Sequence, residues 1–347
     1  MASGESGRDV ALLNYVCNLV FIWVVLWVYT NVGYYQTFIR EETLATIYFF
    51  AVAYTVVGLA ATLFYPYGRV GVGHGLRIVK ALWRITSGVV DYVRRFPGDV
   101  KVRAPSLTDR ERTSILFALV KFFYIPIMLN FLFGNYHDVA NQLGRVESAG
   151  DFLTTGAFNN IIFPFGLSFF LLIDTLYFSF GYLFEAEFLK SKVRSVEPTL
   201  IGWVVALVCY PPFNGLAGRY VPWYANDFVQ FWSPTVTLIA RAAALFLFWI
   251  YLWATLALGT KSSNLTNRGI VSTGPYAHIR HPAYISKNLA WWLTIIPVIN
   301  LPAIAGMTFW SVIYFLRAVT EERHLIRDPD YRRYCKKVKY RFIPGVV

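Results

Sequence analysis

Charged residues are scarce in this chain. They make up 15% of its 347 residues, whereas a soluble domain carries about 25%. Hydrophobic residues reach 56% and the mean hydropathy is +0.46. This composition excludes an ordinary soluble protein and indicates an integral membrane protein. The 11 Trp and 23 Tyr suit the two interfaces of a bilayer, where amphipathic rings collect.

Cysteine is also rare, and the chain has only Cys17, Cys209 and Cys335. Their spacing excludes a disulfide framework and a cysteine-based metal site. Three histidines occur in the C-terminal quarter, namely His278, His281 and His324. No acidic partner stands at ligand spacing within their loop, so we expect no metal site.

Long apolar runs are what the chain has in abundance. Runs of about 20 residues, the length that spans a bilayer, fall at 10–29, 44–64, 115–133, 158–184 and 232–258, and a shorter one at 200–213. The last run, 289–316, has no charge over 28 residues and contains Asn300-Leu-Pro302 near its middle. Because proline stops a helix, this run predicts a helical hairpin. We therefore expect an all-α, polytopic membrane protein with about eight transmembrane segments.

Basic residues predict the orientation of these segments. The loop 66–112 holds ten Lys or Arg against four Asp or Glu, and basic residues flank both ends of the hairpin. By the positive-inside rule, this loop and both termini face the cytoplasm. Within the loop, 76–93 has the pattern of an amphipathic helix that lies on the membrane. We expect a first region at 1–195, which includes this loop, and a second at 196–347.

The net charge of +12 is concentrated at the C-terminal end. Residues 261–347 contain thirteen Lys or Arg and four Asp or Glu, which gives +9. A basic cytoplasmic surface attracts anionic membrane lipids, and it can hold an anionic group of a cofactor or substrate. The basic residues lie beside membrane spans, which disfavours nucleic acid as a partner.

Glycine, proline, histidine and tyrosine residues cluster before the hairpin. Gly274-Pro275-Tyr276 is a turn sequence that lets the backbone approach a ligand. Pro282 is suited to the first turn of a helix, which places His281 at the helix start and Tyr284 shortly after it. Lipid tolerates such groups where they are paired or line a cavity. The cluster therefore predicts a functional site, with structural hydrogen bonding as the simpler alternative for any one histidine.

A second cluster follows the hairpin. Arg317 and Glu321 are four residues apart and share one helix face, next to Glu322. Carboxylates can bind an ammonium group or ribose hydroxyls, and an arginine can hold an anionic acceptor by two parallel bonds. Tyr331 and Tyr334 can stack on a purine or face a sulfonium ion. The alternatives are a surface ion pair and interfacial anchoring of the tyrosines.

Together these motifs resemble the integral-membrane methyltransferases that include isoprenylcysteine carboxyl methyltransferase and phosphatidylethanolamine N-methyltransferase. The resemblance covers about 261–347 and rests on Gly274-Pro275-Tyr276, Arg280-His281-Pro282-x-Tyr284, the hairpin, Arg317-x-x-x-Glu321-Glu322, Tyr331-x-x-Tyr334 and the Ile-Pro at 343–344. It implies S-adenosylmethionine as methyl donor, in a cytoplasmic pocket closed by the C-terminal segment. It also implies a lipidic or prenylated acceptor, with a carboxylate favoured, that enters from the bilayer.

The resemblance implies roles for particular residues. Arg317 and Glu321 correspond to the pair beside the acceptor. The cofactor-binding positions correspond to Gly274, Pro275, Tyr276, His281, Pro282, Tyr284, Glu322, Tyr331 and Tyr334. The region 196–347 is then the methyltransferase-like core. The chain departs from the family pattern in two ways. The first ~200 residues match nothing in the short family members. Ser286-Lys287 occupies positions where the family usually has small neutral residues.

Two other functions stay open from the sequence. The segment from Tyr334 to Pro344 also resembles the tail of NADPH-dependent sterol reductases, although those proteins usually carry Gly-Trp-Trp where this chain has Gly274-Pro275-Tyr276. A non-enzymatic scaffold or transporter is the third possibility. It would use a buried polar path formed by Asp174, Glu185, Glu187, Lys121 and Arg241. The sequence does not identify the acceptor or the oligomeric state.

Overall fold

The computed structural model describes residues 7–64, 71–95, 106–147 and 154–346. Helices dominate these residues, and the strands among them are the short pair β1 (Ser195–Val196) and β2 (Thr266–Asn267). The predicted all-α membrane fold is confirmed. Parts of the predicted loop 66–112, namely 66–70 and 96–105, lie outside the described residues.

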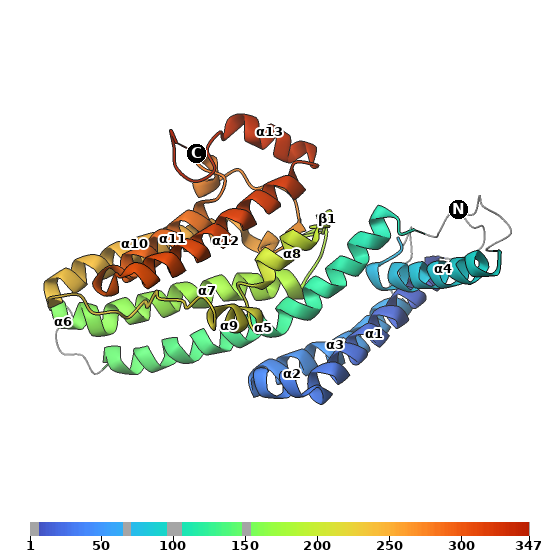
Figure 1. Cartoon of the computed structure of the whole chain (residues 1–347). Coiled ribbons are helices and arrows are strands. Elements are labelled where there is room, and N and C mark those ends of the chain that lie inside the picture. The colour runs from blue at the N-terminus through green and yellow to red at the C-terminus, as the bar shows by residue number, and fades with distance from the viewer. Residues whose placement is uncertain (1–6, 65–70, 96–105, 148–153, 347) are drawn as a thin grey trace. The chain divides into compact units, whose positions relative to one another are not determined.

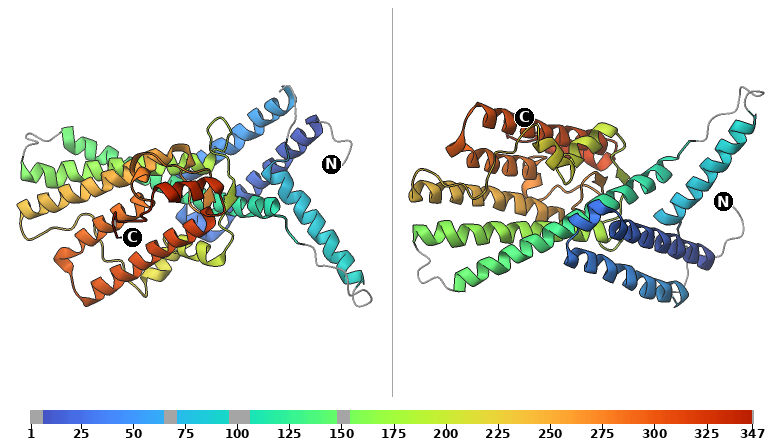
Figure 2. Two further views of the ribbon diagram at one scale, coloured as in Figure 1. Left: turned by 90° about the horizontal axis from the view of Figure 1, so that it is seen from above. Right: turned by 60° about the horizontal axis from the view of Figure 1, so that its bottom comes forward.

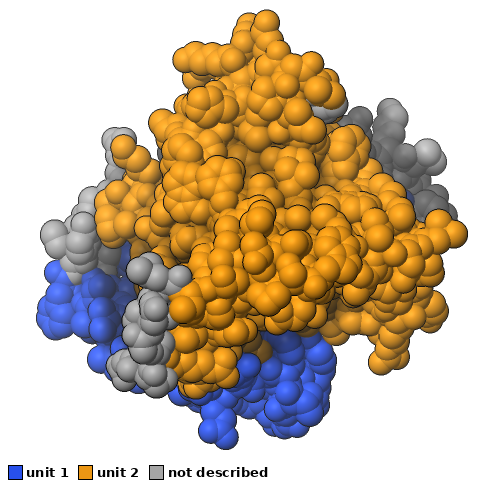
Figure 3. Space-filling view, turned by 90° about the vertical axis from the view of Figure 1, so that its left-hand side faces the viewer, with its two compact units in different colours: residues 1–126 blue, residues 127–347 orange. Residues whose placement is uncertain are grey.

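The chain forms two compact units, Met1–Pro126 and Ile127–Val347, which Figure 3 colours separately. This division follows contacts between residues and falls within the long helix α5 (Asp109–Glu147). The predicted boundary near residue 195 concerns function, and it stays a prediction.

Six helical segments are long and apolar enough to cross a membrane. They are Gly7–Asn31, Glu41–Phe64, Asp109–Arg145, Thr155–Leu183, Pro234–Lys261 and Leu301–Leu325. The two remaining predicted segments correspond to shorter apolar helices, α8 (Leu200–Leu207) and α11 (Pro282–Thr294). The structure thus confirms a polytopic protein, with six helices of spanning length among the described residues.

The first unit contains α1 (Gly7–Asn31), α2 (Gly33–Phe38), α3 (Glu41–Phe64), α4 (His74–Arg95) and the first part of α5. Helix α1 packs on both α3 and α4. The predicted amphipathic helix at 76–93 is confirmed as part of α4. One side of α4 buries Leu76, Ile78 and Ala81, while Trp83 and Val93 belong to an exposed apolar face. The position of this face on a membrane stays a prediction.

The second unit is a helical bundle. Its long helices are α7 (Phe163–Leu183), α10 (Pro234–Leu258) and α12 (Leu301–Leu325), and Figures 1 and 2 show α10, α11 and α12 side by side. Helix α10 packs against α7 and α11, and α12 against α8. The shorter elements are α6 (Thr155–Ala157), η1 (Phe158–Ile162), α9 (Phe213–Gly218), η2 (Gly259–Lys261), η3 (Gly274–Ala277), η4 (Ile296–Val298) and α13 (Pro329–Lys337).

The predicted C-terminal hairpin is confirmed as α11 and α12. Its chain reversal contains η4 and ends at Asn300, whose side-chain oxygen accepts a 2.8 Å hydrogen bond from the backbone N–H of Ala303. This bond satisfies one of the N–H groups that a helix start leaves open. Pro302 stands in the first turn of α12, where a missing N–H costs little.

The chain after α10 is held close to α7. An added Cβ at Gly181 would lie 2.1 Å from the carbonyl oxygen of Ser262, so only glycine permits this approach. The neighbouring Tyr182 hydroxyl accepts two hydrogen bonds from Asn264, at 2.6 Å from its backbone N–H and 2.9 Å from Nδ2. Beyond Asn264, the strands β1 and β2 pair in antiparallel register. These contacts fix the polar segment 262–267.

Candidate functional site

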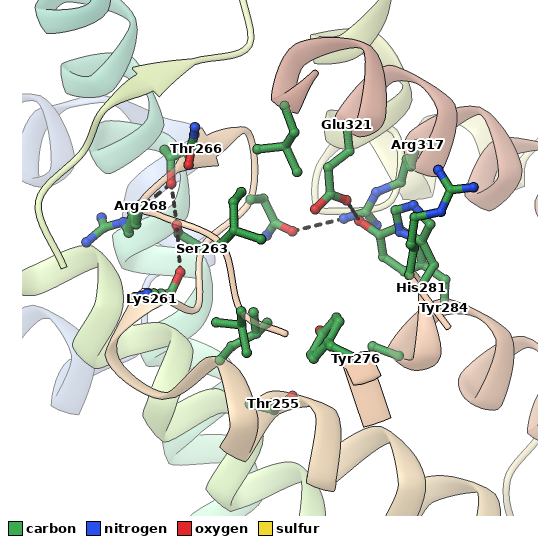
Figure 4. Close-up of a pocket in the computed structure, with 18 of the residues that line it drawn as sticks. Thr255, Lys261, Ser263, Thr266, Arg268, Tyr276, His281, Tyr284, Arg317 and Glu321 are labelled. Atoms are coloured by element: carbon green, nitrogen blue, oxygen red, sulfur yellow. Dashed lines mark hydrogen bonds between the residues drawn. The ribbon is translucent and has the colours of Figure 1, made fainter. Parts of the chain in front are cut away.

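A cavity opens in the second unit between α10, α11, α12, α13 and the polar segment after α10 (Figure 4). It encloses about 1130 Å³, counted with its open mouth. Seven of the eleven predicted site residues line it: Tyr276, His281, Tyr284, Arg317, Glu321, Tyr331 and Tyr334. The cavity therefore brings together both clusters that flank the hairpin in the sequence.

The other four predicted residues, Gly274, Pro275, Pro282 and Glu322, are not part of the cavity wall. Gly274 has a φ of +60°, and an added Cβ would lie 3.3 Å from Nε1 of Trp253 on α10. Glycine is suited to both conditions, so Gly274 lets η3 approach α10. Pro282 opens α11 directly after His281. These residues position their neighbours, and any direct contact with a cofactor stays a prediction.

Arg317 is buried and held from two sides. Its Nη2 donates a 2.9 Å hydrogen bond to Oδ1 of Asn264. Its guanidinium carbon lies 5.3 Å from the ring centres of Tyr284 and Tyr314 and 5.8 Å from that of Tyr210. Cation–π contacts of this kind stabilise a desolvated arginine. The guanidinium is thus fixed at the cavity wall.

Glu321 has a partner of its own. Its Oε2 accepts a 2.9 Å hydrogen bond from the hydroxyl of Tyr284. Arg317 and Glu321 therefore do not form the simple surface ion pair that their spacing also allowed, because each is engaged by a different group. In Figure 4 both side chains lie on the same side of the cavity.

Glu322 is contacted by two arginines and a histidine. Its Oε1 lies 3.1 Å from Nε2 of His281, and its Oε2 accepts hydrogen bonds of 2.9 Å from Nη1 of Arg280 and from Nε of Arg341. The backbone repeats this link, because Arg280 N–H donates to Tyr340 O and His281 N–H donates to Arg341 O, each at 2.9 Å. Glu322 therefore joins α12, the start of α11 and the C-terminal segment.

Helix α13 is tied down by its own charged cluster. Asp328 accepts hydrogen bonds from Nδ2 of Asn267 at 2.8 Å and from Nη1 of Arg194 at 2.9 Å, and the same Arg194 atom lies 2.7 Å from Asp330. Burial acts to raise the pKa of Asp328, but these hydrogen bonds and the Arg194 charge outweigh it and lower the pKa below its ordinary value. The ionised carboxylate is thus the form that holds α13.

Two tyrosines of α13 form the cavity wall on that side. Tyr331 and Tyr334 are buried with Val338, and the Tyr334 hydroxyl donates a 2.7 Å hydrogen bond to the carbonyl of Tyr276. Burial raises the pKa of both Tyr331 and Tyr334, so both hydroxyls stay protonated. The Tyr331 hydroxyl is buried and has no hydrogen-bond partner among the described residues.

Sequence reasoning gave no role to Asn264, which links several site residues. Its Nδ2 also donates to the hydroxyl of Tyr210 at 3.1 Å, while its Oδ1 accepts from Arg317. The signal was the polar stretch that follows a membrane span, because a buried amide there needs partners. Tyr210 carried no signal, since it comes from an apolar run that the fold brings to Arg317.

Residues of the polar path predicted for a transporter make separate local contacts. Asp174 accepts hydrogen bonds from Tyr251 at 2.7 Å and from Thr255 at 2.6 Å. Arg241 donates to backbone carbonyls, and Glu187 is exposed and pairs with Lys192. Lys121 belongs to the first unit. The contacts of Asp174, Arg241 and Glu187 are therefore separate from one another.

Comparison with known proteins gives one match. Residues 235–327 match the model of the isoprenylcysteine carboxyl methyltransferase (ICMT) family. No curated protein and no solved structure matches the chain significantly. The matched residues run from α10 to the end of α12 and include Asn264, Tyr284, Arg317 and Glu321. This region of the chain is therefore similar to the isoprenylcysteine carboxyl methyltransferase family, which is among the integral-membrane methyltransferases that its motifs resemble.

Proposed function

We propose that this protein is an S-adenosylmethionine-dependent methyltransferase whose acceptor is lipidic or prenylated, carries a carboxylate and enters from the bilayer. The observation that carries the proposal is the buried Arg317 guanidinium at the wall of a cavity, fixed by Asn264 and three tyrosine rings. The match to the family model supports the same reaction class. We further propose that both termini and this cavity face the cytoplasm, where the water-soluble methyl donor is available.

The residues of the cavity fit S-adenosylmethionine. Tyr276, Tyr331 and Tyr334 supply aromatic surface suited to an adenine ring or a sulfonium cation. The buried Tyr331 hydroxyl, without a partner among the described residues, suits a polar group of the cofactor. When bound, the cofactor supplies a methyl group that is activated by its positively charged sulfur.

The chain's own residues would then bind and orient the acceptor. Arg317 binds a carboxylate by its guanidinium fork, and its contacts with Asn264 and Tyr284 fix the direction of the fork. A nucleophile that is held in line reacts faster, because the entropy cost of aligning it with the methyl group is already incurred when the acceptor binds. Burial of Arg317 excludes water from this position. A carboxylate acceptor needs no base, whereas for an amine acceptor Glu321 is the group that would accept the proton.

Transfer of labelled methyl to a defined acid tests this function. Purified full-length protein is incubated with S-adenosylmethionine and N-acetyl-S-farnesyl-L-cysteine, and the base-labile methyl ester is counted. We expect ester formation and micromolar-range binding of S-adenosylhomocysteine by calorimetry. Tight binding of NADPH with no binding of either adenosyl compound would instead support a reductase.

A further inference from the structure

The wall of the cavity is strongly cationic. Five basic residues line it: Lys261, Arg268, Arg280, Lys287 and Arg317. Among the described residues that line it, Glu321 is the one acid. An excess of one charge in a cleft favours ligands of the opposite charge. The proposed function uses Arg317 for one carboxylate of the acceptor and gives no role to Lys287.

Lys287 is half-buried on α11 and has cation–π contacts but no hydrogen-bond acceptor. Its Nζ lies 4.7 Å from the ring centre of Tyr251 and 5.3 Å from that of Trp291. Within the described part of the chain, it makes no hydrogen bond or ion pair. An ammonium group has three N–H donors, and aromatic rings offset its charge without satisfying those donors. Lys287 therefore has unused capacity for an anionic ligand in the cavity.

The two acids that act electrostatically on Lys287 do not contact it. They are Asp174 and Asp227. Asp174 already accepts hydrogen bonds from the hydroxyls of Tyr251 and Thr255, one on each carboxylate oxygen. Asp227 is not part of the cavity wall, and its buried Oδ1 has no hydrogen-bond partner among the described residues. These acids offset part of the Lys287 charge, so a direct contact is left for a ligand to make.

Lys287 and Arg317 are linked by a continuous aromatic wall. Lys287 is three residues after Tyr284, so the two share one face of α11, and the Tyr284 ring contacts Arg317. On the other side, the ring of Trp291 lies 5.2 Å from that of Tyr314, which also contacts Arg317. Arg317 is near enough to act electrostatically on Lys287. One ligand that carries two anionic groups can therefore contact both cations.

We propose that Lys287 binds a second anionic group of the methyl acceptor, so that the preferred acceptor is a lipidic acid with two negative charges. This inference rests on the proposed function, in which Arg317 holds the carboxylate that is methylated. It also gives a role to one of the positions where the chain departs from the family pattern. The acceptor is favoured over the donor because Lys287 contacts apolar α10 and α11, whereas the tyrosines suited to adenosine stand on η3 and α13.

Paired acceptors test the inference on the unmodified protein. N-malonyl-, N-succinyl- and N-glutaryl-S-farnesyl-L-cysteine carry a second carboxylate at increasing distance from the first, and the matched partner of each ends in an uncharged carboxamide. Methyl transfer to the cysteine carboxylate is measured. In at least one pair we expect the KM of the diacid to be about tenfold below that of the amide, because hydrogen bonds between charged groups are strong. Equal KM values within all three pairs would overturn the inference.

The variant Lys287→Met tests whether this residue causes the preference. Methionine keeps an unbranched side chain beside Tyr251 and Trp291 but removes the ammonium group. We expect the KM ratio of amide to diacid to fall to about one, with S-adenosylhomocysteine affinity retained. Lys287→Gln also removes the charge, and it decides the question if Lys287→Met does not fold. The control Lys336→Met removes an exposed lysine of α13 and should keep the KM ratio of the unmodified protein.

Lys261 is the main competing cation. It lies ten residues beyond Tyr251 along α10 and η2, roughly 15 Å away at the rise of a helix. A diacid preference that persists in Lys287→Met and disappears in Lys261→Met would assign the second anionic group to Lys261 and overturn the inference.

The remaining outcomes separate this inference from the proposed function. Methylation of N-acetyl-S-farnesyl-L-cysteine without preference for any diacid leaves the function intact and removes the role of Lys287. Loss of S-adenosylhomocysteine binding in Lys287→Met assigns the lysine to the donor and also overturns the inference. If the unmodified protein methylates none of these acids, the proposed acceptor class is wrong, and the inference is overturned with it.

Discussion

The hydroxyl of Tyr284 donates a 2.9 Å hydrogen bond to Oε2 of Glu321. The same tyrosine ring lies 5.3 Å from the guanidinium carbon of Arg317. Tyr284 follows the start of α11, whereas Glu321 and Arg317 stand on α12, so one side chain orients two residues of the other arm of the hairpin.

Arg317→Ala should separate acceptor chemistry from donor binding. Removing the guanidinium leaves the tyrosines of α13 in place, so S-adenosylhomocysteine affinity should stay nearly unchanged. Single-turnover methylation should fall by ~10²-fold or more, because the acceptor loses its in-line alignment. Arg332→Ala, at an exposed position on α13, is the control and should behave as the unmodified protein. Loss of donor binding in Arg317→Ala would show that the role assignment is wrong.

Glu322→Gln should weaken donor binding through its neighbours. Glu322 holds His281 and Arg280, which line the cavity, and Arg341 of the C-terminal segment. Hydrogen bonds to charged groups contribute about 1.5–3 kcal/mol each, so a loss of about tenfold in S-adenosylhomocysteine affinity is expected. Faster proteolysis after Arg341 should accompany it.

The control for this variant is Glu111→Gln, which removes the ion pair with Arg84 in the first unit. It should change neither donor affinity nor cleavage near Arg341. Unchanged donor affinity in Glu322→Gln, together with slower turnover, would instead place Glu322 on the acceptor side.

The attachment of α13 should depend on pH through Asp328. Its pKa is lowered in the folded protein, so its contribution is complete above the ordinary range of an aspartate, about 3.9. The contribution is lost as the pH falls from there through the lowered folded pKa. The protection of α13 against hydrogen exchange, relative to the intrinsic exchange rate at each pH, should therefore fall below about pH 4. In Asp328→Asn this protection should be low at neutral pH and less sensitive to acid, and an identical pH profile in both proteins would contradict the prediction.

Gly181→Ala should destabilise the second unit. The new methyl group would meet the Ser262 carbonyl at 2.1 Å, and such overpacking costs about 1–3 kcal/mol. Thermal unfolding in detergent should show a lower Tm. The matched control is Gly144→Ala in α5, where an added Cβ has nothing within 4 Å and where alanine favours the helix. An equal or higher Tm for Gly181→Ala would mean that α7 and the segment after α10 are not in this contact.

The orientation in the membrane is tested by labelling. Ser87 is exposed on the polar side of α4, and Gln36 is exposed in the connection after α1. With the three native cysteines replaced, Ser87→Cys should react with a membrane-impermeant reagent only after the cells are opened. Gln36→Cys should react from outside. Labelling of Ser87→Cys in intact cells would contradict cytoplasmic termini.

The sequence predicted features that depend on local pattern. Apolar length predicted the spanning helices, and Asn300-Leu-Pro302 predicted the hairpin, because both depend on spacing along the chain. Two predicted segments, at α8 and α11, are shorter than a full span. The helix is shorter than the apolar run because some apolar residues lie in turns. After α11, for example, Ile296 and Pro297 belong to η4.

The sequence alone also determined the two polar clusters, the similarity of 235–327 to the family model, and seven residues of the cavity wall. Only the tertiary structure decided how those residues are used. Arg317 and Glu321 share a helix face in the sequence, yet each has a separate partner that comes from another element. Asn264 and Tyr210 reach the site from a polar and an apolar stretch with no distinctive spacing. Their roles depend on contacts between distant segments, because a buried polar group takes its function from the partner that packing brings to it.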